Sequence, residues 1–279
     1  MSRFACPVCG GRLEREGPVY RCEKRHSYDA AAEGYVYLLP PNKKHSRMPG
    51  DDREMVASRR RFLEGGWYAP FSDALNRLCR ECLAGAGEDP VILDAGCGEG
   101  WYTGRLARSL EESGLLPEAY GFDISKFAVK AAAKKYGAIS FAVGSMFGIP
   151  FCSGEADLVT DVFAPVVPEE FLRVLRPGGH LILAVPSARH LYGLKQILYD
   201  EPYENETRDT EYPGFEFLRR VPVRGELATD DPQVMRDLFA MTPYYWKTPK
   251  EGCERLTRTA SLKTETGFDF LIYRKAADL

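Results

Sequence analysis

Hydrophobic residues change their spacing along the chain near residue 90. In the segment 68–83 they recur three and four positions apart, which predicts a helix, and a shorter helix is expected over 54–63. Beyond residue 90, short runs rich in Val, Leu and Phe alternate with helical stretches. We expect strands over 91–93, 119–122, 140–143, 158–162 and 181–185, and helices from 103, over 126–136 and over 168–175. Strands separated by helices predict an α/β fold, with a parallel sheet covered by helices on both faces.

The pattern changes after Pro186. We expect helices over 190–199 and 231–241, a strand over 215–227, and a closing β pair formed by 256–263 and 268–273. An irregular stretch rich in Glu and Asp follows the first of these helices. No internal repeat or low-complexity segment appears.

The chain before the sheet divides into two further parts. Residues 1–38 form short alternating segments around a glycine turn, which indicates a small separate unit. Pro40-Pro41 and Pro49-Gly50 then interrupt any helix. We therefore expect a small domain over 1–38, a basic linker and helix over 39–62, and the α/β domain over 63–279.

The composition is that of a globular protein, with 44% hydrophobic and 28% charged residues. No apolar run is long enough to span a membrane, and the first residues lack the pattern of a secretory leader. These features predict a cytoplasmic protein without membrane contact.

Positive charge gathers near the N-terminus, although the whole chain has a net charge of −3. Residues 41–61 hold seven Lys and Arg against three acidic residues, and residues 1–30 hold six against four. Such a basic segment is either an ordinary solvated face or a surface that contacts nucleic-acid phosphates, and charge alone does not separate the two.

Four residues near the N-terminus have the spacing of metal ligands. Cys6-x2-Cys9 is followed after twelve residues by Cys22-x3-His26. Three thiolates and one imidazole complete a tetrahedron, so this pattern predicts a structural zinc site with no open position for water. Cys79 and Cys82 also have a CxxC spacing, but they lie in the helical pattern of 68–83, and we interpret them as packing residues.

A glycine-rich turn follows the predicted strand over 91–93. The segment 91–100 reads VILDAGCGEG, and we expect Asp94, Gly96 and Gly98 to contact a cofactor beyond the end of the strand. The third glycine of a dinucleotide-binding fingerprint would fall at 101, where this chain has Trp101. S-adenosylmethionine has no pyrophosphate and would instead pack its amino-acid and sugar parts against the turn.

Residues at the ends of the next strands support this interpretation. Asp123 ends the second strand and can accept both ribose hydroxyls. Met146 follows the third strand and is expected beside the adenine ring, while Asp161 ends the fourth strand and would face the transferred methyl group. The arrangement resembles the class I, Rossmann-like S-adenosylmethionine-dependent methyltransferases.

The combination of motifs is similar to one particular family, the bacterial 23S rRNA (guanine-N1)-methyltransferases. The matching segments, in chain order, are Cys6-Pro7-Val8-Cys9, Glu33-Gly34-Tyr35-Val36, Leu38-Leu39-Pro40, Pro49-Gly50-Asp51, Arg59-Arg60-Arg61-Phe62-Leu63, residues 96–103, Phe163-Ala164-Pro165, Arg189-His190-Leu191 and Met241-Thr242-Pro243. The resemblance covers almost the whole chain and is weaker over 201–240.

The resemblance implies a zinc-ribbon RNA-recognition domain joined to a class I methyltransferase domain, acting as a homodimer. It implies methylation of N1 of a guanine in a hairpin loop of domain II of 23S rRNA. It implies Zn²⁺ at the Cys and His cluster, and S-adenosylmethionine as the methyl donor. Cofactor contacts are implied for Tyr68, Gly98, Glu99 and His190.

Guanine N1 carries a proton at neutral pH, so transfer to N1 requires a proton acceptor. Asp161 is the candidate catalytic residue by its position, with water or a loop carboxylate as alternatives. Two other functions remain open from the sequence. One is methylation of another RNA or of a small molecule, and the other is a non-catalytic zinc-ribbon protein associated with the ribosome.

Overall fold

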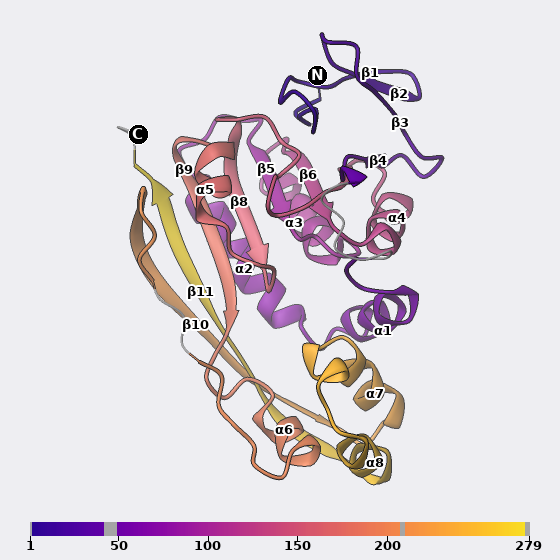
Figure 1. The fold of residues 1–279 in the computed structure, drawn as a ribbon. Coiled ribbons are helices and arrows are strands. Elements are labelled where there is room, and N and C mark those ends of the chain that lie inside the picture. The colour runs from indigo at the N-terminus through magenta and orange to yellow at the C-terminus, as the bar shows by residue number, and fades with distance from the viewer. Residues whose placement is uncertain (1, 42–48, 207–209, 277–279) are drawn as a thin grey trace.

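The structure is a computed structural model that describes residues 2–41, 49–206 and 210–276. The basic residues Lys43, Lys44 and Arg47 lie outside the described residues. A three-stranded antiparallel sheet near the N-terminus consists of β1 (Glu14–Glu16), β2 (Val19–Arg21) and β3 (Ser27–Asp29). An eight-stranded sheet forms the centre of the molecule (Figure 1).

The large sheet has the strand order β10-β11-β9-β8-β5-β6-β7-β4. Its strands are β4 (Val36–Tyr37), β5 (Val91–Ala95), β6 (Glu118–Asp123), β7 (Ser140–Val143), β8 (Ala156–Val162), β9 (Leu175–Pro186), β10 (Phe215–Thr229) and β11 (Leu262–Lys275). The strands from β9 to β4 are parallel, whereas β11 and β10 are antiparallel additions at one edge. The five parallel strands expected from the sequence are confirmed.

The chain reverses its direction of travel across the sheet between β5 and β8. From β5 it adds β6 and β7 on one side, and it then returns to add β8 and β9 on the other side. Ligands of such sheets bind at this switch point, outside the carboxyl ends of the strands. The topology therefore marks the ends of β5, β6 and β8 as the place for a site.

Helices cover one face of the large sheet, and α5 together with the N-terminal unit covers the other. The helices are α1 (Arg53–Glu64), α2 (Ala69–Cys82), α3 (Trp101–Glu112), α4 (Lys126–Lys135), α5 (Pro168–Val174), α6 (Tyr192–Leu198), α7 (Pro232–Ala240) and α8 (Lys250–Arg258). Apolar residues of α2 and α3 pack on the face that Ile92 presents. The opposite face, presented by Val91 and Leu93, is covered by α5 and by apolar residues of the small N-terminal unit. Cys79 is fully buried in the first of these cores, in agreement with its interpretation as a packing residue.

The expected β pair at the C-terminus is wrong. Residues 256–258 end the helix α8, and β11 is one continuous strand that pairs with β10 on one side and β9 on the other. Gly267 lies inside β11, where a Cβ would come within 2.2 Å of the Ser187 hydroxyl. The glycine permits close approach of two chain segments and does not reverse the chain.

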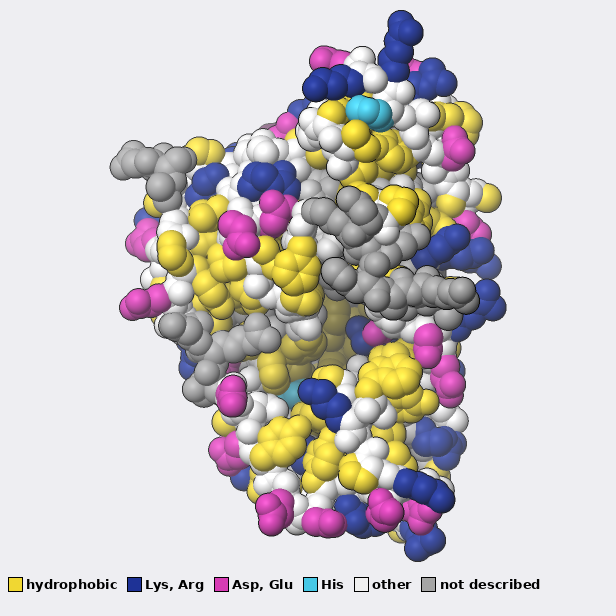
Figure 2. Space-filling view, viewed as in Figure 1, with side chains coloured by type: hydrophobic (Ala, Val, Ile, Leu, Met, Phe, Trp, Pro, Cys, Tyr) yellow, Lys and Arg dark blue, Asp and Glu magenta, His cyan; other side chains and the backbone are white. Residues whose placement is uncertain are grey.

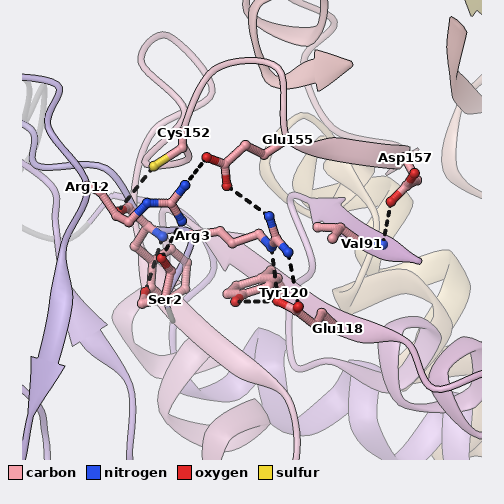
Figure 3. Close-up of polar contacts among 10 residues, drawn as sticks. Ser2, Arg3, Arg12, Val91, Glu118, Tyr120, Cys152, Glu155 and Asp157 are labelled. Atoms are coloured by element: carbon pink, nitrogen blue, oxygen red, sulfur yellow. Dashed lines mark hydrogen bonds and ion pairs between the residues drawn. The ribbon is translucent and has the colours of Figure 1, made fainter. Parts of the chain in front are cut away.

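The N-terminal unit is fixed to the large sheet by pairing and by charge. Val36 and Tyr37 pair in parallel with β7, so the last residues of this unit form an edge strand of the large sheet. Arg3 lies between two carboxylates, donating to Glu118 at 2.9 Å and to Glu155 at 3.1 Å (Figure 3). Arg12 also pairs with Glu155. The unit is thus held in one position against the sheet.

In the part of the chain that the structure describes, no helix has the length and the apolar character needed to cross a membrane.

Candidate metal centre and cofactor site

Four side chains of the N-terminal unit converge in a geometry that fits zinc. Cys6, Cys9, Cys22 and His26 place one ligand atom each within 4.8 Å of one another. The Cys9 and Cys22 sulfur atoms are 3.7 Å apart, and His26 Nδ1 lies 3.5 Å from Cys6 Sγ and 3.4 Å from Cys22 Sγ. A zinc tetrahedron with ordinary Zn–S and Zn–N bonds has edges of about 3.8 Å between sulfurs and about 3.6 Å between sulfur and nitrogen.

Two tight turns present these ligands. Cys6 accepts a backbone hydrogen bond from Gly10 at 2.8 Å, and Cys22 accepts one from Arg25 at 2.8 Å. Gly10 and Arg25 both have positive φ angles, of 72° and 63°. The first turn brings Cys6 and Cys9 together, and the second brings Cys22 and His26 together. The four ligands fill a tetrahedron, so zinc bound here acts as a structural cross-link.

The glycine turn after β5 has the conformation that a close ligand requires. Gly96, Gly98 and Gly100 have φ angles of 77°, 55° and 79°, which side chains disfavour. The backbone N–H groups of Gly96 and Cys97 both donate to the carbonyl of Phe122 at 2.9 Å. At Gly98 a Cβ would meet only Arg59, at 3.8 Å, so the backbone of this residue is open toward the cavity.

Two aspartates, the buried Asp94 and the half-buried Asp123, hold this turn in place. Asp123, at the end of β6, accepts hydrogen bonds from the backbone of Gly98 at 3.0 Å and of Ser125 at 2.7 Å. Asp94, at the end of β5, accepts from the hydroxyls of Thr103 at 2.5 Å and Thr160 at 3.0 Å. Burial raises the pKa of both carboxyl groups, to about 6 for Asp94 despite the hydrogen bonds from the two threonines.

A cavity of about 480 Å³ opens beside this turn, at the switch point of the sheet. Its walls come from the carboxyl ends of β5, β6, β8 and β9, from the linker before α1, and from the segment after α7. Figure 2 shows a hollow near the middle of one face, with hydrophobic side chains in its depth. Residues far apart in the chain therefore share one chamber of the size that a nucleoside-like ligand needs.

The linker before α1 forms one wall of the cavity. Gly50 has a φ of 79° and packs so closely on the loop after β6 that a Cβ would lie 2.8 Å from Ile124. Asp51 accepts a hydrogen bond through its backbone carbonyl from the Ser125 hydroxyl at 2.6 Å. Arg59 on α1 pairs with the Asp51 carboxylate at 2.7 Å and donates to the Met241 carbonyl at 3.2 Å. Arg59 thereby connects the two segments that border the cavity.

Several polar atoms at the cavity are buried without a hydrogen-bond partner among the described residues. Among them are the hydroxyl of Tyr68 and one carboxylate oxygen of Glu99. Burial raises the pKa of Tyr68 well above its ordinary value and also raises the pKa of Glu99, whose other oxygen accepts from Arg60 at 3.3 Å. Buried polar atoms are ordinarily satisfied, so both indicate that a polar ligand belongs in the cavity.

His190 also lines the cavity, where its neutral ring can donate a hydrogen bond. Its ring is buried, and burial lowers its pKa to about 3. The backbone N–H of Gly267 donates to Nδ1 at 3.3 Å, which leaves the ring proton on Nε2. The imidazole therefore offers an N–H group and carries no positive charge at neutral pH.

The remaining predicted site residues differ in their position. Asp161 lines the cavity, and its carboxylate accepts a hydrogen bond from the backbone of Ala164 at 2.8 Å. Met146 is buried beneath the glycine turn near Gly96, and it is not among the described residues that line the cavity. Of the nine cofactor and catalytic residues predicted from the sequence, eight thus line one chamber.

Several lining residues were not predicted from the sequence. Asp51 belongs to the linker before α1, Arg59 to α1 itself, and residues 242–244 to a turn after α7. Their positions depend on how distant helices pack, which hydrophobic periodicity does not reveal. Pro49-Gly50 breaks any helix, and a glycine beside a proline also indicates a close contact of the backbone.

The chemistry of the lining residues fits S-adenosylmethionine. This cofactor combines a ribose diol, an ammonium group and a carboxylate. The cavity offers a carboxylate in Asp123, an unsatisfied carboxylate oxygen in Glu99, and donors in Tyr68, Arg59 and His190. A switch-point cavity with a glycine turn and this set of polar groups defines the class: an S-adenosylmethionine-dependent methyltransferase.

Comparisons with known proteins give the family. A family model described as the RlmA N-terminal zinc ribbon matches residues 4–47, and one described as a methyltransferase domain matches residues 87–242. A 23S rRNA (guanine(748)-N(1))-methyltransferase of Streptomyces fradiae is 32% identical over 94% of this chain and 92% of its own length. A relative in Bacillus subtilis and one in Micromonospora griseorubida, each named a putative 23S rRNA (guanine-N(1)-)-methyltransferase, are 32% and 33% identical over 98% and 89% of this chain, and 98% and 88% of their own lengths. The chain belongs to the 23S rRNA (guanine-N1)-methyltransferase family, uses S-adenosylmethionine and binds zinc.

Proposed function

We propose that this enzyme methylates N1 of a guanine in 23S rRNA, in a hairpin loop of domain II. The proposal rests on one observation: the same chain contains both the zinc centre and the methyltransferase cavity. The relatives that act on 23S rRNA match nearly the whole chain, including the N-terminal unit. Methylation of a small molecule would give that unit no task.

The cofactor is proposed to bind with its parts distributed along the cavity. When bound, S-adenosylmethionine supplies a sulfonium methyl group that the guanine accepts. Asp123 receives the ribose hydroxyls, and the backbone beside Gly96 and Gly98, supported by Asp94, lies against the sugar and amino-acid parts. Glu99, Tyr68 and His190 supply polar contacts, and their unsatisfied or donor atoms at the cavity support this assignment. Met146 stays a prediction for the adenine side.

The zinc unit and the basic linker are proposed to hold the RNA. Residues 1–38 form the recognition domain, 39–62 the basic linker and helix, and 63–279 the catalytic domain. Exposed cations of the N-terminal unit, among them Arg15 and Arg21, support a contact with phosphates. RNA binding through such contacts weakens steeply as salt rises. We also propose that the enzyme is a homodimer and acts in the cytoplasm, where assembling ribosomes are found.

Asp161 is proposed to take the proton from guanine N1. It is a buried carboxylate at the carboxyl end of β8 and lines the cavity that would receive the base. Replacing Asp161 with Asn keeps the shape and removes the acceptor charge. We expect D161N to lower kcat at least about 100-fold, in the range of general-base catalysis, with the Kd for S-adenosylmethionine unchanged. An unchanged kcat would assign the proton to water or to another group.

The function is tested by transfer of labelled methyl groups to 23S rRNA that lacks the modification. Mass spectrometry of the RNA then locates the product. A single 1-methylguanosine in the domain II hairpin supports the proposal and identifies the nucleotide. Methylation of another RNA, or of small acceptors alone, would refute it while leaving the methyltransferase class intact. Light scattering of the purified protein tests the dimer separately.

A further inference from the structure

We propose that Phe163 is the platform on which the target base stacks during methyl transfer. This inference rests on the proposed function, because it assigns a position to the RNA base in the same cavity. Phe163 follows β8 directly, two residues after Asp161. Its side chain lines the cavity and remains 45% exposed, unlike the fully buried phenylalanines around it.

The backbone holds this ring in a conformation that phenylalanine disfavours. Phe163 has a φ of 64°, in the left-handed region that ordinarily suits glycine or asparagine. The turn is fixed on both sides, because the N–H of Ala164 donates to Asp161 at 2.8 Å and the N–H of Phe163 donates to Ala184 at 3.3 Å. Ala164 also packs on Gly96 so closely that a Cβ there would lie 2.5 Å away. A strained, exposed aromatic residue at the end of a strand indicates a function.

Other aromatic rings support Phe163 from behind. Its ring is nearly parallel to that of Phe71, at 5.8 Å between centroids and 18° between planes, and to that of His190, at 6.4 Å and 21°. Phe268 lies 5.3 Å away and contacts both of these rings. Phe268 lies 4.2 Å from Phe71 and 4.6 Å from His190, so the three rings gather on one side of Phe163. The exposed part of the ring therefore faces the cavity.

The distribution of polar groups in the cavity indicates that the Phe163 ring receives the target base and not the sugar of the cofactor. Asp123 and the glycine turn lie at the ends of β6 and β5, and these residues offer the polar contacts that a sugar needs. Phe163 lies with Asp161 at the end of β8, across the switch point from Asp123. A flat aromatic face beside a carboxylate suits a purine that must be stacked and deprotonated at its edge. Unpaired bases in proteins are commonly held by such stacking.

The experiment compares single substitutions in the full-length enzyme, with 23S rRNA lacking the modification as substrate. We expect F163A to lower kcat/KM for the RNA about 10- to 100-fold, while the Kd for S-adenosylmethionine stays within about twofold. F163Y and F163W keep a flat ring and should retain kcat/KM within about threefold. F147A is the matched control, because Phe147 is 68% exposed and is not among the described residues that line the cavity.

The variant F163G separates stacking from folding. Glycine accepts the left-handed φ, so F163G should unfold at the same temperature as F163A or higher and still lose activity like F163A. Equal kcat/KM for the wild type and F163A would refute the role of Phe163 and leave the proposed function intact. A loss of S-adenosylmethionine affinity as large as the loss of kcat/KM would reassign the ring to the cofactor. If the wild type itself transfers no methyl group to 23S rRNA, the proposed function fails and this inference fails with it.

Discussion

The zinc centre and the cofactor cavity are built in opposite ways. The four zinc ligands lie between residues 6 and 26, and two short turns bring them together. The residues that line the cavity extend from Gly50 to Tyr244, and only the order of strands in the sheet and the packing of helices unite them. A metal centre of this kind is encoded by local spacing, whereas a cavity at the switch point is encoded by topology.

The two sites also differ in what stabilises them. The zinc unit is too small to have a large apolar core, and its buried residues Phe4 and Leu13 belong to the core of the large sheet. The cavity is surrounded by cores on both faces of that sheet. The comparison implies that loss of zinc should unfold the small unit and leave the cavity functional.

The largest expected effect is that of replacing a zinc ligand. C9S should abolish stoichiometric zinc binding, because structural zinc contributes on the order of 10 kcal/mol to the folding of such units. Hydrogen exchange of residues 2–38 should become fast, while S-adenosylmethionine binds within about threefold of the wild-type affinity. C253S on α8 is the control, since this cysteine lies outside the cluster. Simultaneous loss of cofactor binding would show that the two sites form one folding unit.

The complementary change is made at the cavity. D123N removes the charge that Gly98 and Ser125 hydrogen-bond and that the ribose is proposed to use. Charged hydrogen bonds contribute about 1.5–3 kcal/mol, so the Kd for S-adenosylmethionine should rise about 10- to 100-fold in calorimetry. Zinc content should stay at one equivalent. The exposed Asp89 gives the control D89N, and an equal effect of both variants would remove Asp123 from the site.

A third prediction concerns pH and belongs to the cavity alone. The folded state holds His190 neutral with a pKa of about 3, whereas an unfolded histidine titrates near pH 6.5. Above pH 6.5 the histidine is neutral in both states and the free energy of unfolding is at its full value. As the pH falls from 6.5 toward 3, only the unfolded histidine takes up a proton, so the free energy of unfolding decreases. Between pH 7.5 and pH 5 the wild type should lose about 2 kcal/mol more than H190N does.

Urea unfolding at each pH measures this difference. The half-buried His180 provides the control H180N, which should keep most of the wild-type pH dependence. If H190N loses stability with falling pH as steeply as the wild type, His190 is not the buried neutral group that the structure indicates.

The smallest expected effect is at the junction between the two regions. R3A removes the contacts to Glu118 and Glu155, which are partly exposed, so the cost should be about 1 kcal/mol and about 2–3 °C in Tm. R21A removes only the exposed pair with Glu16 and should change Tm by less than about 1 °C. Calorimetry of both variants checks the order. Equal shifts would mean that Arg3 does not fix the zinc unit to the sheet.

Sequence patterns identified the parts of the molecule that short-range rules govern. The zinc ligands follow from spacing, and Asp94, Asp123 and Asp161 follow from the rule that parallel strands end at the same edge. Arg59 and residues 242–244 were missed, because packing between α1 and the segment after α7 positions them. The same limit explains Gly267, whose role in β11 depends on the neighbouring segment that contains Ser187.

The attachment of the zinc unit to the sheet has a consequence for biosynthesis. Residues 6–26 leave the ribosome before the large sheet is made and can bind zinc at once, but their docking partners are made much later. Arg3 and Val36 must wait for β7 and for Glu155, more than 100 residues downstream. At about 5–20 residues per second, the delay is on the order of 5–25 s. During this interval Phe4, which is buried in the finished protein, has no surface to cover it, so the nascent chain carries an exposed apolar patch beside an already metallated ribbon.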